Sequence, residues 1–69
     1  MDPAVKRFGE NVRAARLAKG WTQERLAQET GLATVQISRI ERGVREVRLT
    51  TLLRLVEALK TTPDQLLPG

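Results

Sequence analysis

A short break between two helical segments constrains the fold of this chain more than any other feature. Apolar residues recur at helical spacing over residues 23–29 and again from about Ala33 to Arg42, with only Thr30–Leu32 between the two runs. So short a connection leaves little side-chain room for an antiparallel return, and Gly31 can adopt the left-handed backbone that a tight turn needs. We therefore expect the two helices to cross steeply, with Ala27 small enough for the close approach.

Helix-start and helix-stop signals recur along the rest of the chain. Asp2-Pro3 predicts the start of a first helix, and Gly20 is a suitable end for it. A fourth helix is predicted from about Leu49 to Lys60, and Thr62 with Gln65 predicts a capping box for a short fifth helix. The remaining boundary residues are Thr22, which should cap the second helix, and Gly43, which should end the third. The expected inward residues are Val5, Phe8, Val12 and Ala15 in the first helix, Leu26 and Ala27 in the second, Leu49, Leu52, Leu53, Val56 and Leu59 in the fourth, and Leu66 and Leu67 in the fifth.

Signals for β-strands are weak throughout. The chain contains one Trp, one Phe and no Tyr, and it shows no alternating apolar pattern. We predict an all-α fold of five short helices in a single domain over residues 1–69, with a helix-turn-helix at about 22–42. A chain of 69 residues buries only a modest core, so good helix packing or self-association should support the fold.

The absence of two residue types narrows the possible functions. The chain has no cysteine and no histidine, which excludes disulfides, zinc–thiolate sites and the commonest general base. The eight acidic residues are scattered and suggest no catalytic pair, so we expect no enzyme activity, no metal site and no cofactor. The N-terminus lacks the apolar segment of a signal peptide, and no apolar run approaches membrane-spanning length. The prediction is a cytoplasmic protein with neither a membrane partner nor a small-molecule ligand.

The third predicted helix has two chemically different faces. With residues placed at intervals of about 100°, Ile37 and Ile40 form a narrow apolar stripe with Glu41 at its border. The opposite face carries Val35, Ser38, Arg39 and Arg42. The chain has 12 basic residues against 8 acidic ones, a net charge of +4, and all the basic residues except Lys6, Lys19 and Lys60 are arginines. This bias suits the bidentate recognition of phosphates and guanine edges.

The outer face of this helix offers the chemistry that base reading requires. Arginine can donate two hydrogen bonds to guanine, glutamine can pair with adenine, and a methyl-bearing side chain can pack on the thymine methyl group. Arginines also continue into the following loop at three-residue intervals, at Arg39, Arg42, Arg45 and Arg48. The alternative is an ordinary solvated helix face with one exposed valine. The helix-turn-helix context favours a face that reads DNA.

Two stretches, WTQERLAQETGLATVQISRIERG and LTTLLRLVEALKTTPDQLL, resemble the Cro and phage-repressor type of helix-turn-helix domain, also called xenobiotic-response-element-like. The resemblance covers about residues 5–67. The matching positions are Gln23, Leu26, Ala27, Gly31, Ile37, Ile40, Glu41-Arg42-Gly43 and Asp64-Gln65-Leu66-Leu67. The resemblance implies a compact five-helix lambda-repressor-like fold and a two-fold dimer. It also implies binding of double-stranded operator DNA, with the third helix in the major groove.

The resemblance further implies roles for individual residues. The residues expected to contact bases are Thr34, Val35, Gln36 and Arg39. Those expected to contact phosphates are Thr22, Gln23, Ser38, Arg42 and Arg45. Arg16 is expected to form a structural ion pair with Glu41. Ala33 departs from the family pattern, in which a Ser or Thr usually caps the third helix, so Thr34 or the backbone must compensate. Val35 replaces a residue that is often polar and shifts the expected readout towards thymine methyl groups.

The function predicted from this resemblance is a homodimeric transcriptional regulator that binds a short inverted-repeat operator. Because the chain is short and ends directly after the fifth helix, a restriction–modification controller protein is the favoured type. Dimerisation is expected within about residues 56–69, through Leu66 and Leu67, with Leu66 completing the core and Leu67 reaching the partner. RNA polymerase is left open as a further partner. The alternative is an antitoxin or protein-docking adaptor with the same fold, which would lack the steep salt dependence of DNA binding.

Overall fold

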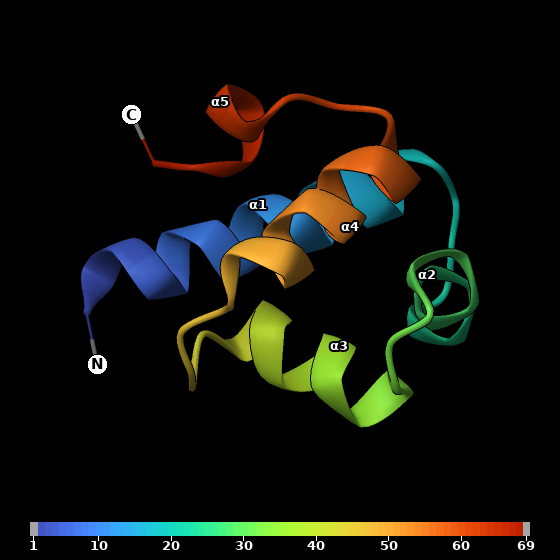
Figure 1. The fold of residues 1–69 in the computed structure, drawn as a ribbon, viewed down its shortest axis with the longest axis horizontal. Coiled ribbons are helices and arrows are strands. Elements are labelled where there is room, and N and C mark those ends of the chain that lie inside the picture. Colours follow the sequence, from blue (N-terminus) through green and yellow to red (C-terminus); the bar gives the residue numbers. More distant parts are fainter. Residues whose placement is uncertain (1, 69) are drawn as a thin grey trace.

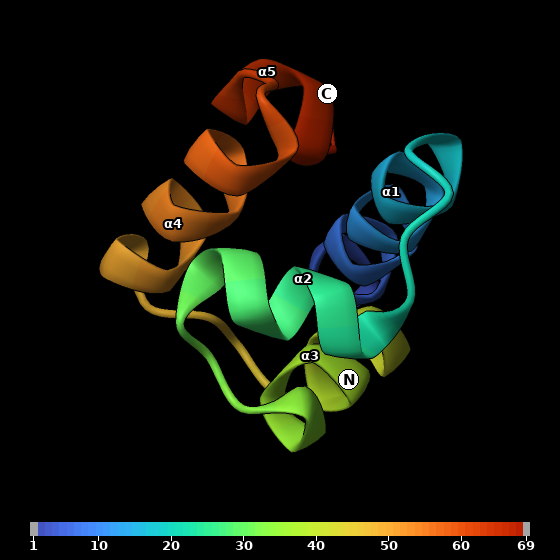
Figure 2. The ribbon, with the colours of Figure 1, turned by 90° about the vertical axis from the view of Figure 1, so that its right-hand side faces the viewer.

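The computed structural model describes residues 2–68, and within them the chain forms five α-helices and no strand, which confirms the predicted all-α fold. The helices are α1 (Pro3–Ala18), α2 (Gln23–Thr30), α3 (Thr34–Arg42), α4 (Leu49–Leu59) and α5 (Pro63–Leu66). Figure 1 shows α3 at one side of the molecule and α5 at the other. In Figure 2, α2 lies across the molecule between α4 and α3. None of these helices is long and apolar enough to cross a membrane.

The first helix and the last one begin in different ways. The Asp2 side chain accepts a hydrogen bond from the Ala4 N–H at 2.8 Å, so α1 starts with the predicted cap. At α5 the predicted capping box of Thr62 and Gln65 is wrong, because the Thr62 side chain makes no capping bond. Instead, the Thr61 hydroxyl donates to Gln65 Oε1 at 2.7 Å and occupies the oxygen that a capping box would use.

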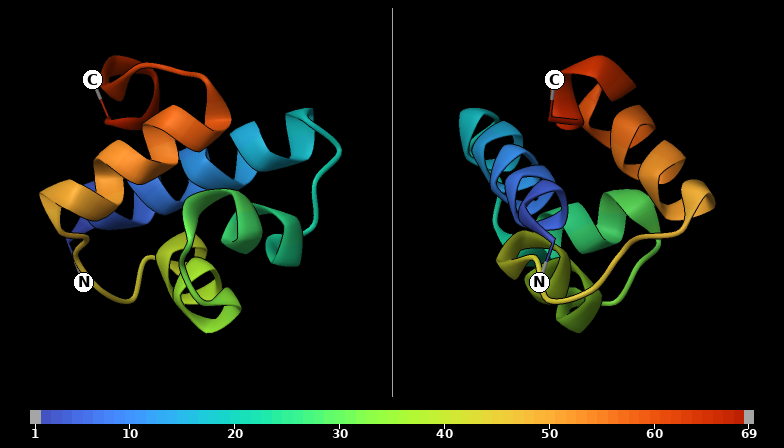
Figure 3. Two further views of the ribbon diagram at one scale, coloured as in Figure 1. Left: turned by 45° about the vertical axis from the view of Figure 1, so that its right-hand side comes forward. Right: turned by 90° about the vertical axis from the view of Figure 1, so that its left-hand side faces the viewer.

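All five helices bury apolar side chains in one common core, and α5 contributes Leu66. The buried apolar residues are Phe8, Val12, Leu26, Ala27, Ile37, Ile40, Leu55, Leu59 and Leu66. A hydrogen bond from Asn11 Nδ2 to the Leu66 carbonyl oxygen, at 2.8 Å, ties α5 to α1. Figure 3 shows the result, with α5 folded back at the far side of the molecule from α3.

The inward face of α4 differs from the prediction. Leu49 and Leu53 were expected inside, but they are 70% and 50% exposed, whereas Leu55 is fully buried. At about 100° per residue the apolar side chains of α4 cover an arc of roughly 160°, from Leu55 through Leu59 to Leu53. The core of so small a molecule covers only the Leu55 and Leu59 side of that arc. The other side stays in contact with solvent.

A glycine inside α1 allows that helix to lie directly against α3. A Cβ atom at Gly9 would overlap the Ile40 carbonyl oxygen and would come within 2.9 Å of the Glu41 carbonyl oxygen. The close contact therefore requires a residue without a side chain at this position. The sequence contained a signal for it, since an isolated glycine within a helical pattern often marks close packing.

Candidate nucleic-acid interface

The turn between α2 and α3 is held by a small set of hydrogen bonds. Gly31 ends α2 in the left-handed conformation, with φ of 74°, and its N–H donates to the Ala27 carbonyl oxygen at 2.9 Å. The Thr30 hydroxyl donates to the Leu26 carbonyl oxygen at 2.8 Å and accepts from the Leu32 N–H at 3.3 Å. These bonds set the direction in which the chain enters α3, as the glycine-centred break predicts.

The residues on the inner side of α3 are buried against the other helices. Ile37 is completely buried, and Ile40 is 7% exposed. Glu41 is buried as well, and it faces Arg16 of α1 with two hydrogen bonds: Arg16 Nε to Glu41 Oε2 at 2.7 Å and Arg16 Nη2 to Glu41 Oε1 at 2.9 Å. This is the ion pair that the family resemblance implied, and its bidentate geometry holds α3 against α1.

Two further hydrogen bonds extend this ion pair to α2. The third arginine nitrogen, Arg16 Nη1, donates to the Trp21 carbonyl oxygen at 2.8 Å, just before α2 begins. Gln23 Nε2 donates to Glu41 Oε1 at 3.2 Å, so the side chain expected to contact phosphate is braced on the carboxylate. The hydrogen bonds that Arg16 donates to Glu41 raise the pKa of Arg16, whereas burial acts in the opposite direction, so the guanidinium keeps its charge.

The outer side of α3 is exposed along its length. Val35 is 58% exposed, and Arg39 and Arg42 are exposed too. Arg42 Nε makes a long hydrogen bond, 3.4 Å, to the Ser38 carbonyl oxygen of its own helix. Between residues 2 and 68 no ion pair engages Arg39, Arg42 or the exposed Arg45 of the next loop. These three guanidinium groups are therefore available to an anionic partner.

The start of α3 has an unexpected cap. Ala33 occupies the N-cap position, and its N–H donates to Gln36 Oε1 at 3.0 Å. The backbone compensates for the missing Ser or Thr, as one of the two predicted alternatives, because the Ala33 carbonyl oxygen accepts from the Gln36 N–H at 2.9 Å. The Gln36 side chain adds the bond to the Ala33 N–H by reaching back over the first turn, as the last residue of a capping box does. Gln36 was also expected to contact a base, and the residue is exposed at the edge of the outer face.

The other predicted contact residues lie near α3 or at the start of α2. Thr22 accepts a hydrogen bond from the Arg25 N–H at 3.0 Å, so its hydroxyl caps α2 and remains at the surface. Thr34 and Ser38 are half-buried on the flanks of α3. The structure therefore brings the predicted base-contacting and phosphate-contacting residues to α3, the start of α2 and the adjacent loop.

The two leucines assigned to a dimer interface have different environments. Leu66 is 1% exposed and completes the core, as expected, so it offers no surface of its own to a second copy. Leu67 is 43% exposed and can meet a partner. The sequence did not identify Leu49 and Leu53 on α4 as exposed, although both are more exposed than Leu67.

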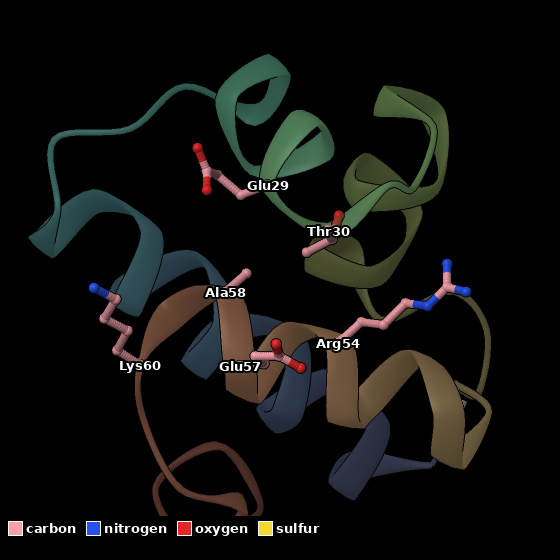
Figure 4. Close-up of a pocket in the computed structure, with 6 residues that line it drawn as sticks. All are labelled: Glu29, Thr30, Arg54, Glu57, Ala58 and Lys60. Carbon is pink, nitrogen blue, oxygen red and sulfur yellow. The ribbon is translucent and has the colours of Figure 1, made fainter.

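A hollow of about 330 Å³ lies between the end of α2 and the second half of α4 (Figure 4). Figure 4 shows Arg54 and Lys60 pointing in opposite directions, away from the two acidic residues Glu29 and Glu57. Glu29 is already paired with Arg25 at 2.9 Å. The charged groups do not converge on one point, so we assign no ligand here. Residues 2–68 also contain no group of three His, Cys, Asp or Glu residues that could hold a metal ion.

Comparisons with known proteins agree with this geometry. Residues 12–66 match a family model described as helix-turn-helix. Control protein C.BamHI from Bacillus amyloliquefaciens is 44% identical over 61 residues, which cover 87% of this chain and 75% of that protein. The crystal structure of the restriction–modification controller protein C.AhdI from Aeromonas hydrophila matches with 40% identity and a TM-score of 0.86, over 90% of this chain and 94% of that one. The controller protein C.Esp1396I, as a tetramer in complex with its natural 35-base-pair operator, matches with 29% identity and a TM-score of 0.84, over 90% of this chain and 82% of that one.

Proposed function

The chain belongs to the helix-turn-helix family, and from this premise we propose that it is a transcriptional regulator that binds double-stranded operator DNA. Its similarity to C.BamHI and C.AhdI supports the role of a restriction–modification controller protein. It acts by binding, without catalysis, in the cytoplasm. The observation that carries the proposal is the division of α3 into a buried side, which is held by Glu41, and an exposed side, which presents Arg39 and Val35.

The exposed side of α3 enters the major groove in this proposal. Arg39 donates to a guanine edge, and Val35 packs on a thymine methyl group, while Thr34 and the amide nitrogen of Gln36 contact neighbouring bases. Phosphates are held on both flanks of the groove, by Arg42 and by the residues Thr22, Gln23, Ser38 and Arg45. The helix-turn-helix at about residues 22–42 then recognises the DNA sequence, within a single DNA-binding domain.

The regulator acts as a homodimer, which supplies a second recognition helix. Leu49 and Leu53 lie one turn apart on α4, are 70% and 50% exposed, and together with the 43% exposed Leu67 present apolar surface that a second copy would cover. This surface begins earlier in the chain than the region 56–69 predicted from the sequence. A two-fold dimer places its two α3 helices about 34 Å apart, so that they read half-sites one helical turn apart. RNA polymerase is a candidate for a further partner.

The salt dependence of DNA binding tests the proposal. The association constant for a duplex selected from random sequences should fall steeply as the salt concentration rises. A plot of its logarithm against the logarithm of the salt concentration should have a slope of about −0.9 for each neutralised phosphate. Six contacts would weaken binding about a thousandfold between 50 and 200 mM salt. A flat salt response together with tight binding to a protein would instead favour the antitoxin or adaptor reading.

The proposed dimer surface has a matched control in the chain. Leu53→Glu places a charge in the interface and should shift sedimentation at micromolar concentration from dimer to monomer. Leu17 of α1 is 53% exposed, nearly the same as Leu53, but it lies outside the proposed surface. Leu17→Glu should therefore leave the dimer intact. Equal effects of the two substitutions, or a monomeric parent, would contradict the interface.

A further inference from the structure

An open hollow of about 410 Å³ lies where α1 meets the start of α2 and the end of α3. Three cations line it: Lys6 and Arg13 of α1, and Arg42 of α3. Gln23 and Ser38 line it as well. The hollow therefore brings together three side chains that were expected to contact phosphate and two basic residues of α1 for which the sequence predicted no role.

The first turns of α1 are held beside the end of α3 by backbone packing. A Cβ atom at Gly43 would come within 2.6 Å of the Lys6 Cα atom, and one at Gly9 would overlap the Ile40 carbonyl oxygen. Lys6 and Arg13 are spaced seven residues apart, so they lie on one face of α1 about two turns from each other. Figure 1 shows this end of α1 descending towards the side of the molecule where α3 lies.

The charge of the hollow is positive. Of its two acidic residues, Glu41 is neutralised by the bidentate bond from Arg16, which leaves Glu10 as the carboxylate that opposes the three cations. In the chain from residue 2 to residue 68, no ion pair engages Lys6, Glu10 or Arg13. Lys6 and Arg13 are exposed, so their charged groups can meet an anion without first breaking a contact.

We propose that this hollow binds a phosphate group of the DNA backbone, so that α1 joins α2 and α3 as a third DNA-contacting element through Lys6 and Arg13. The inference rests on the proposed DNA-binding function. Phosphates carry no base identity, so these contacts strengthen binding to any sequence without changing the preference for the operator. Glu10 opposes the phosphate and limits this general affinity.

The test uses the full chain and two duplexes of about three helical turns, one of mixed sequence and one selected for tight binding. Lys6→Gln and Arg13→Gln should each weaken binding to both duplexes, and the double variant should weaken it by roughly five- to tenfold near 100 mM salt and lower the salt slope by about 0.9, the contribution of one phosphate. Glu10→Gln should tighten binding to both duplexes by about threefold, because one repulsive charge is removed. Circular dichroism verifies that each variant is folded.

Two controls match the substituted residues. Arg7 follows Lys6 in α1 but lines a different hollow with Asn11 and Leu67, so Arg7→Gln should leave the salt slope unchanged. Glu57 is an exposed acid on α4, away from the hollow, and Glu57→Gln should not tighten binding. If Lys6→Gln, Arg13→Gln and Glu10→Gln bind like the parent while Arg42→Gln loses affinity, the inference fails and the proposed function stands. A parent chain without salt-dependent DNA binding would overturn both.

Discussion

Helix α3 buries Ile37 completely on one side and leaves Val35, only two positions earlier, 58% exposed on the other. The buried side is bound to α1 through Glu41 and Arg16, and its apolar residues belong to the core. The exposed side makes almost no contact with the rest of the chain. The difference shows that a helix of nine residues can be anchored by one side while the other stays exposed to solvent. The following substitutions test whether stability and DNA recognition are divided in this way.

Glu41→Ala should have the largest effect, and it should act on stability. The substitution leaves Arg16 buried without its bidentate partner, which costs about 3–5 kcal/mol of unfolding free energy. Urea denaturation measures the change. A loss below about 1 kcal/mol would show that the pair behaves like an exposed surface pair, and the contrast between the two sides of α3 would break down.

The double variant Arg16→Met, Glu41→Leu is the control for this substitution. Replacing both charges with apolar side chains of similar volume should restore most of the stability that Glu41→Ala loses. Gln23 would still lack the carboxylate that accepts its hydrogen bond, so affinity for DNA should stay reduced even in this stable variant.

Gly9→Ala should destabilise the fold by about 1–3 kcal/mol, because the new methyl group overlaps the Ile40 carbonyl oxygen. Helix propensity alone predicts the opposite sign, since alanine is favoured over glycine within a helix by about 1 kcal/mol. Ala14→Gly, at an exposed position of the same helix, measures that propensity term separately. A Gly9→Ala variant more stable than the parent would contradict the close packing of α1 on α3.

Arg39→Ala tests the exposed side and should leave stability within about 0.5 kcal/mol of the parent. Its effect should appear in recognition, as a loss of about 1–3 kcal/mol of discrimination at one base position of each half-site. Binding to a set of single-base operator variants measures this loss. If the variant discriminates among these duplexes as the parent does, Arg39 does not read a base.

Gln36→Ala should lower the free energy of unfolding by only about 1 kcal/mol, because the Ala33 N–H loses its acceptor at the start of α3. Gln36→Glu keeps an oxygen at this place and puts a negative charge near the helix N-terminus, so it should retain parental stability. Thermal denaturation of the two variants measures the difference. Equal loss in both would show that the capping bond contributes little.

The helices and the turn could be predicted because their signals are local. The cap at Asp2 and the left-handed Gly31 need only a few neighbouring residues to act, and both occur as predicted. The Arg16–Glu41 pair joins residues 25 positions apart and came instead from the resemblance to a known family.

The predictions that were wrong depend on contacts between helices or on several groups that compete for one hydrogen bond within a turn. The periodicity of α4 identifies a wide apolar arc, but only the packing of the other helices determines that Leu55 is inside and Leu49 outside. The capping box of Thr62 and Gln65 was wrong for a related reason, since several nearby groups compete for one hydrogen bond and their geometry decides the outcome. Lys6 and Arg13 were not assigned because their position depends on where α1 packs against α3.

The cap formed by Gln36 also limits the order in which this sequence can diverge. Residue 36 lies at the edge of the surface proposed to read DNA, yet in this chain its side chain completes the start of α3. A descendant that changes residue 36 to suit a new operator loses that capping bond while alanine occupies position 33. A prior change of Ala33 to Ser, Thr, Asp or Asn would offset this loss with a different bond, in which the side-chain oxygen accepts from a backbone N–H of the first turn. New operator preference at residue 36 should therefore arise in lineages that first acquire a polar residue at 33.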